Sequence, residues 1–169
     1  MSNSRGYRNN NPGNIRITKI PWVGKVAATA NTDGAFEQFV HLKYGVRAMI
    51  LDVRGKISKG LNSIEKLLAV YAPKNENNSG AYVATVARLS GLKAGQVLNT
   101  NKDTLQRLVI AMSQVENGKA LTAGQFEEGW AVLAATHADV VNTVKKTASQ
   151  SSSPLASADS ESGSGSQVS

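Results

Sequence analysis

The strongest candidate for chemistry is a glutamate near the end of the stretch TLQRLVIAMSQVENG. Apolar residues at helical spacing predict an amphipathic helix over about residues 103–117, and Glu116 falls within its apolar stripe. Burying a bare carboxylate is too costly to occur by default, so such a residue is paired, protonated or functional. Apolar surroundings and the negative end of the helix dipole both disfavour the ionised form. A carboxylic acid that keeps its proton near neutral pH is what a general acid of glycosidic cleavage requires.

Each candidate for chemistry could instead have a purely structural role. The helix could fray at its end, so that Glu116 turns to solvent or pairs with Lys119. Glu76 is the second choice for catalysis, but its place near a helix start stabilises the charged form and suits a cap or a sugar-contacting carboxylate better. Tyr82, on the following helix, could reach a cleft, or it could be a core residue with a bonded hydroxyl.

Six other positions carry weaker expectations. Glu37 lies beside Phe36 in a strand-like piece and is expected on a solvated strand face. Trp22 could stack on a sugar ring or cover the core, and Asp33 is expected to be a turn residue. The basic residues Arg47, Arg54 and Lys56 are expected on a solvated helix face. A second catalytic carboxylate, which a glycoside hydrolase normally needs, is not identified beyond Glu76 or Glu37.

Composition narrows the functional classes. The 169 residues include 19 Lys and Arg against 12 Asp and Glu, a formal net charge of +7, so an anionic partner is expected. Basic runs never exceed two residues, which weakens a nucleic-acid role. Cysteine is absent, which excludes a disulfide framework and a thiol nucleophile. The two histidines, His41 and His137, lack metal-ligand spacing, so we expect neither a metal nor another cofactor.

The elements that must position Glu116 follow from periodicity and turn signals. Short strand-like pieces at 15–17, 22–26 and 35–40 predict a small N-terminal antiparallel sheet. Helices are predicted from residue 44 to Gly60 and over 63–71, 79–91, 103–117 and 123–146. The predicted fold class is therefore α+β, mostly helical.

The predicted organisation is one folded domain with an appendage. Residues 1–146 form the domain, and residues 147–169 are a Ser-rich tail whose composition predicts disorder. The first residues contain no apolar segment of a signal peptide, and no run of about 18 apolar residues follows. We therefore expect synthesis in a cytoplasm and no membrane span.

Four stretches, in this order, resemble a family of phage proteins described as virion structural or muralytic: RGYRNNNPGNIRI, GAFEQFVHLKYGVRAM, YAPKNENNSGAYVATVA and AMSQVENG. The resemblance covers roughly residues 5–130. The same pieces resemble segments of the lysozyme-like superfamily, in lytic transglycosylases and flagellar-type glucosaminidases, but there the catalytic helix comes first. The resemblance therefore implies a lysozyme-like domain that is circularly permuted, which is feasible where the chain ends lie close together.

The permuted arrangement implies which residues form the site. Glu116 is then the catalytic acid, and the segment RNNNPGNIR lines the sugar cleft, where amides can bond N-acetyl groups and hydroxyls. The implied substrate-binding residues are Asn10, Asn11, Asn14, Arg16, Glu76 and Tyr82. The alternative is that this segment is an ordinary N-terminal turn packed on the sheet.

The resulting functional expectation is a phage enzyme that cleaves peptidoglycan between N-acetylmuramic acid and N-acetylglucosamine during penetration of the host wall. Lytic transglycosylases work with one glutamate, so they are favoured over muramidases. The alternatives are a non-catalytic virion structural or peptidoglycan-binding protein and, third, a DNA-associated internal protein. The expected partners are bacterial peptidoglycan and other virion proteins, with no specific nucleic acid. The expected location is the virion, or the host cytoplasm before release to the cell wall.

Overall fold

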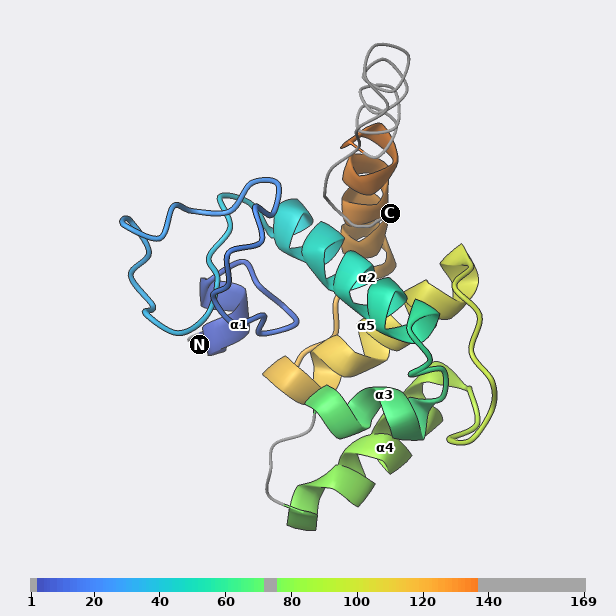
Figure 1. The fold of residues 1–169 in the computed structure, drawn as a ribbon. Helices are drawn as coiled ribbons and strands as arrows, with labels where there is room; N and C mark the ends of the chain where they lie inside the picture. Colours follow the sequence, from blue (N-terminus) through green and yellow to red (C-terminus); the bar gives the residue numbers. More distant parts are fainter. Residues whose placement is uncertain (1–2, 72–75, 137–169) are drawn as a thin grey trace. The chain divides into compact units, whose positions relative to one another are not determined.

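A computed structural model describes residues 3–71 and 76–136 of the chain, without the side chains of 76–79 (Figure 1). The chain divides into two compact units, residues 1–130 and 131–169, of which the second is described only over the helical residues 131–136. The helices are α1 (Arg5–Arg8), α2 (Leu42–Ser58), α3 (Ile64–Tyr71), α4 (Glu76–Ser90) and α5 (Lys102–Asn117). A sixth helix begins at residue 123 and is described to residue 136. None of the described helices is long and apolar enough to cross a membrane.

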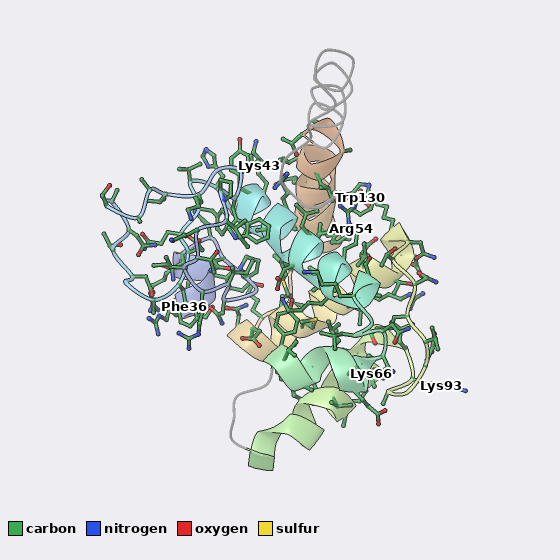
Figure 2. All side chains as sticks on the ribbon, in the orientation of Figure 1. Phe36, Lys43, Arg54, Lys66, Lys93 and Trp130 are labelled. Carbon is green, nitrogen blue, oxygen red and sulfur yellow. The ribbon has the colours of Figure 1, made fainter. Side chains whose placement is uncertain are left out.

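The predicted N-terminal sheet is wrong, although the mostly helical character is confirmed. Between α1 and α2 the described chain contains no strand, only isolated antiparallel bridges that join Arg16 to Phe36 and Lys25 to Phe39. Side chains form hydrogen bonds with backbone groups that would otherwise pair in a β-ladder. Asn11, for example, bonds to both the amide and the carbonyl of Ile15. Such local side-chain bonds compete with strand pairing. The segment is therefore an ordered loop structure, which also contains Phe36 (Figure 2).

Helix α5 is central to the site and begins at Lys102, one residue before the predicted start. The side chain of Asn101 accepts a hydrogen bond from the Thr104 amide at 2.9 Å, and Gly118 adopts the left-handed conformation with φ of 74°. The apolar face of the helix is fully buried, with contributions from Leu105, Leu108, Val109 and Met112. Helix α5 contacts α1, α2 and α4, so it connects the N-terminal segment with the helical core.

The remaining predicted helices are also present. The apolar stripe of α2 is buried as its periodicity predicts, and Ser63 caps α3 by accepting from the Lys66 amide at 3.1 Å. Helix α4 begins at Glu76, earlier than the predicted start at about residue 79. The last predicted helix does begin at residue 123, but its part beyond residue 136 and the Ser-rich tail lie outside the described residues.

Two charged positions that we expected on solvated faces are buried. Glu37 is only 1% exposed and forms an ion pair of 3.0 Å with Lys25, while the Thr18 amide donates to the same carboxylate. Arg47 is also buried, and burial, followed by the nearby charge of Arg54, lowers the pKa of Arg47 to about 10. Asp33 behaves as predicted for a turn residue, since it accepts hydrogen bonds from the amides of residues 35 and 36.

The N-terminal segment packs tightly against α2 and α5. A Cβ on Gly45 would overlap the carbonyl oxygen of Asn10, so only glycine allows this approach. Asn117, the last residue of α5, accepts a hydrogen bond from the Ser4 hydroxyl at 2.7 Å and donates one to the Pro12 carbonyl at 2.8 Å. These contacts fix residues 9–14 beside the end of α5, where Glu116 lies.

Candidate functional site

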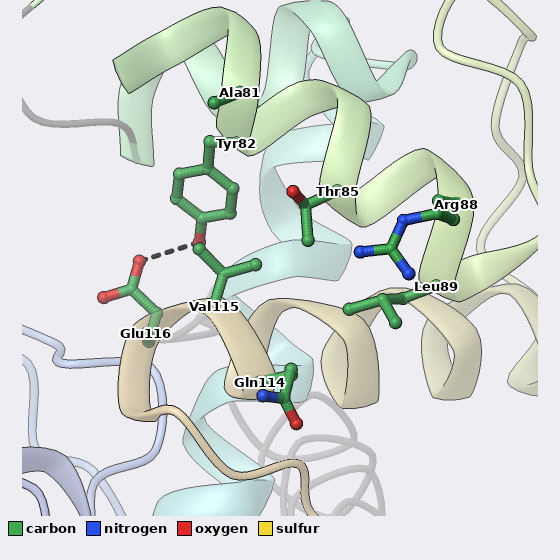
Figure 3. Close-up of a pocket in the computed structure, with 8 residues that line it drawn as sticks. All are labelled: Ala81, Tyr82, Thr85, Arg88, Leu89, Gln114, Val115 and Glu116. Atoms are coloured by element: carbon green, nitrogen blue, oxygen red, sulfur yellow. Dashed lines mark hydrogen bonds between the residues drawn. The ribbon is translucent and has the colours of Figure 1, made fainter. Parts of the chain in front are cut away.

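Glu116 lies partly exposed in the last turn of α5, and each of its two carboxylate oxygens accepts a hydrogen bond. Asn14 donates through Nδ2 to Oε1 at 3.0 Å, and the Tyr82 hydroxyl donates to Oε2 at 2.7 Å (Figure 3). The donors come from the N-terminal loop and from α4. The structure thus brings together three residues that were singled out from the sequence. Glu116 neither points freely into solvent nor pairs with Lys119, because no ion pair of Glu116 occurs among the described residues.

Asn14 is held in position by an unusual backbone conformation. Its φ is 50°, in the left-handed region that asparagine tolerates better than most residues, and its amide donates to the Asn11 carbonyl at 3.0 Å. The side-chain Oδ1 is buried and has no hydrogen-bond partner within the described chain. A left-handed backbone costs free energy in a residue other than glycine, so Asn14 is placed at the expense of stability. Positions of this kind concentrate at functional sites.

Tyr82 is both a core residue and a hydrogen-bond partner of Glu116. The residue is 5% exposed and belongs to the core, yet its hydroxyl reaches the Glu116 carboxylate. Burial, and then the neighbouring charge of Glu116, raise the pKa of Tyr82 far above its ordinary value. The hydroxyl therefore keeps its proton throughout the physiological range and can donate or accept a hydrogen bond.

A groove of about 570 Å³ runs between α4 and α5 next to this cluster. Its lining residues are Ala81, Tyr82, Thr85, Arg88, Leu89, Gln114, Val115 and Glu116 (Figure 3). Glu116 is the single carboxylate among them. Within the described residues, no group of three or more histidine, cysteine, aspartate or glutamate side chains lies close enough to hold a metal ion. The groove therefore offers one carboxyl group, one guanidinium and several neutral donors to a polar ligand.

The other two asparagines predicted to contact substrate, Asn10 and Asn11, both donate hydrogen bonds to backbone carbonyls. Asn11 is fully buried, and its Nδ2 donates to the carbonyls of Ile15 and Glu37, both at 2.9 Å. Asn11 therefore supports the loop and cannot touch a substrate, contrary to the prediction. Asn10 is partly exposed and donates through Nδ2 to the Phe39 carbonyl at 2.9 Å, so its role at the cleft stays a prediction.

The other two predicted binding residues are not seen at the carboxylate. Arg16 is exposed, its guanidinium lies 4.9 Å from the centre of the Phe36 ring, and it does not line the groove. Glu76 is the first residue of α4, but its side chain lies outside the described part of the structure. Its role as an alternative catalytic or sugar-binding group stays a prediction.

The structure adds a second polar cluster that sequence reasoning missed. The Tyr71 hydroxyl donates a short hydrogen bond to Asp52 Oδ2, while Lys56 Nζ pairs with Oδ1 at 2.6 Å. Burial and Asp52 are the leading causes of the strongly raised pKa of Tyr71, and the charge of Glu116 also contributes. The spacing of Asp52 and Lys56, one helical turn apart, is a signal that could have indicated their pairing. The contact with Tyr71 on α3 depends on packing and carries no such signal.

The chain belongs to a family of bacteriophage proteins, as its motifs predicted. The relative that shows this is Protein P5 of Pseudoalteromonas phage PM2, which is 36% identical over 119 residues. The aligned part covers 68% of this chain and 72% of Protein P5. No protein-family model matches the chain.

Proposed function

We propose that this phage protein is a lytic transglycosylase that cleaves the peptidoglycan glycan strand after N-acetylmuramic acid, with Glu116 as its catalytic acid and base. The observation that carries the proposal is the position of Glu116, which is held by Asn14 and Tyr82 beside a groove. A carboxyl group with fixed orientation in the lining of a groove is suited to proton transfer on a bound ligand.

The proposed reaction uses one proton and one carboxyl group. Protonated Glu116 donates its proton to the glycosidic oxygen as the bond to the muramic acid C1 breaks. The 6-hydroxyl of the same sugar attacks C1, and the Glu116 carboxylate accepts the hydroxyl proton, which restores the acid and leaves a 1,6-anhydro product. The Tyr82 hydroxyl can donate to the ionised carboxylate and accept from the protonated one, because a hydroxyl serves both purposes. Tyr82 and Asn14 are therefore positioning residues that orient Glu116.

The surroundings of Asp52 favour this reaction over hydrolysis. A glycoside hydrolase normally requires a second free carboxylate as nucleophile or as base for water. The charge of Asp52, like that of Glu116, raises the pKa of Tyr71. The two carboxylate oxygens of Asp52 are, however, occupied by Tyr71 and Lys56. Its arrangement is that of a structural ion pair. Among the described residues that line the groove, Glu116 is then the one carboxylate available, as the proposed transglycosylase reaction requires.

The permuted lysozyme-like fold is part of the same proposal. Asn14 and Glu116 are separated by 102 positions in the chain, yet they are joined by a hydrogen bond. This contact supports a cleft in which the NNPGNIR segment follows the catalytic helix in space, although it precedes that helix in sequence. We place the activity in penetration of the host wall, for which the excess of positive charge favours association with anionic wall polymers.

A non-catalytic peptidoglycan-binding protein is the second candidate. In its favour, both oxygens of Glu116 accept hydrogen bonds from donors, an arrangement that suits an ionised carboxylate used to bind sugar hydroxyls. The two functions predict different products from purified wall sacculi. The transglycosylase releases anhydro-muropeptides that mass spectrometry identifies, a muramidase releases fragments with reducing ends, and a binding protein co-sediments with the sacculi without releasing either.

A further inference from the structure

The groove beside Glu116 continues along α4 toward a basic end. Tyr82, Thr85 and Leu89 lie on one face of this helix, with Arg88 beside them, and Figure 3 shows Arg88 and Leu89 at the far end from Tyr82 and Glu116. Arg88 follows Tyr82 by six positions, which corresponds to roughly 9 Å along the helix axis. A ligand bound at Glu116 therefore has room to extend toward the guanidinium.

Arg88 is exposed and forms no ion pair or hydrogen bond with another described residue. Arg107, on the opposite helix, differs in this respect: it pairs with Asp103 at 2.9 Å and donates to the Ser90 carbonyl at 3.1 Å. The position of Arg88 in the last turn of α4 is favourable for a cation because of the helix dipole. The helix dipole would stabilise Arg88 equally if its side chain pointed away from the groove. In the structure, however, Arg88 lines the groove.

The other residues at this end of the groove fit a ligand with both polar and apolar parts. Thr85 and Gln114 offer a hydroxyl and an amide between the two charged ends, and Leu89 is 43% exposed. A guanidinium binds a carboxylate through two parallel hydrogen bonds, a geometry that neutral sugar hydroxyls do not match. Unsubstituted neutral glycan would leave Arg88 without a partner.

We infer that Arg88 forms a subsite for a carboxylate carried by the glycan strand, so that the protein prefers acidic, muramic-acid-containing polymer over neutral glycan. This inference rests on the proposed function and names the chemistry of its substrate. Two sources of the carboxylate exist in peptidoglycan: the lactyl group of muramic acid and the stem peptide. The subsite recognises the chemistry that they share.

The test is binding of disaccharide fragments, which lack the bond that the enzyme is proposed to cleave, measured by calorimetry on the full chain. The three probes are the peptide-bearing disaccharide, the peptide-free disaccharide with its lactyl carboxylate, and the peptide-bearing disaccharide with all carboxyls converted to methylamides. The variant Arg88→Gln is compared with wild type and with Lys66→Gln, which removes the same charge from an exposed site on α3 that does not line the groove (Figure 2).

Arg88→Gln is expected to weaken binding of at least one carboxylate probe about 5-fold, the scale of an exposed ion pair. Lys66→Gln is expected to bind like wild type, and the methylamide probe is expected not to distinguish Arg88→Gln from wild type. If Arg88→Gln loses affinity for the peptide-bearing probe alone, the carboxylate that Arg88 binds belongs to the stem peptide. If it loses affinity for the lactyl probe, that carboxylate belongs to muramic acid. Equal affinities of Arg88→Gln and wild type, or no binding of either carboxylate probe, would overturn the inference. If the wild type does not cleave sacculi, the proposed function is refuted instead. A difference in probe affinity between Arg88→Gln and wild type would still stand, because the probes are not cleaved.

Discussion

Replacing Tyr82 by Phe removes one hydroxyl from the site and leaves the ring in the core. Among the described residues, the bond of 2.7 Å to Glu116 Oε2 is the one lost, while the bond from Asn14 to Oε1 remains. A hydrogen bond to a charged group contributes about 1.5–3 kcal/mol. Because Glu116 is partly exposed, water replaces part of this bond, and we expect the free energy of unfolding to fall by about 1 kcal/mol.

The effect on catalysis is expected to be larger than the effect on stability. If Tyr82 orients Glu116 in the transition state, a loss of about 1.5 kcal/mol there lowers kcat and kcat/KM about tenfold, with little change in KM. The assays are urea denaturation, in which the midpoint shifts at constant slope, and the rate of muropeptide release from sacculi. The control is Tyr44→Phe, because the Tyr44 hydroxyl forms no hydrogen bond with the described residues.

A double-mutant cycle separates this contact from general damage. Tyr82→Phe combined with Glu116→Gln is expected to show a coupling free energy of about 1 kcal/mol in unfolding, because each change disturbs the same bond. Strict additivity, or a Tyr82→Phe protein that behaves like Tyr44→Phe in both assays, would refute the reasoning.

Two further predictions concern the loop structure that holds Asn14. The hydrogen bond from Arg5 is the largest cause of the lowered pKa of Asp33, so its stabilisation is complete above about pH 4 and is lost as the pH falls through the lower folded pKa. Urea midpoints are therefore expected to fall less between about pH 6 and pH 3 in Asp33→Asn than in wild type, and an equal fall would contradict this. Lys25→Met leaves the buried Glu37 carboxylate without its cation and is expected to cost about 3 kcal/mol of unfolding free energy. A loss below about 1 kcal/mol would show that the pair behaves like an exposed one.

The helical part of the fold could be predicted because its signals are local. Periodicity identified the buried stripe of α2, and Asn101 and Gly118 are end signals that lie next to the helix they delimit. The start of α4 was placed too late because the residues before Gly80 are polar and have no apolar period. Boundaries of this kind depend on the neighbouring helix as well as on the sequence.

The N-terminal segment could not be predicted correctly, since its interactions are non-local. Short strand-like pieces separated by turn signals favour strands, but Asn11 and Asp33 bond to backbone groups that strands would pair. Strand alternation predicts Glu37 on the face opposite Phe36 and hence in solvent, but its partner, Lys25, lies twelve positions away and across a turn. No pattern in the sequence marks such a pair.

The contacts of the candidate site could be predicted only in part. The pattern and the family resemblance identified Glu116, Asn14 and Tyr82 separately, and the structure joins them through two hydrogen bonds. The groove and Arg88 were not anticipated, because a groove between α4 and α5 depends on how the two helices pack. The pairing of Tyr71 with Asp52 was missed for the same reason.

The most direct test of the account compares wild type with Glu116→Gln on purified wall sacculi, with released muropeptides identified by mass spectrometry. Glutamine preserves the shape of the side chain but cannot donate the proton that the reaction requires. The account predicts anhydro-muropeptides from the wild type and a loss of at least about 100-fold in the variant, with the urea midpoint showing that the variant is folded. Equal release of anhydro-muropeptides by the two proteins would contradict the assignment of Glu116, and co-sedimentation without any release would establish the binding protein instead.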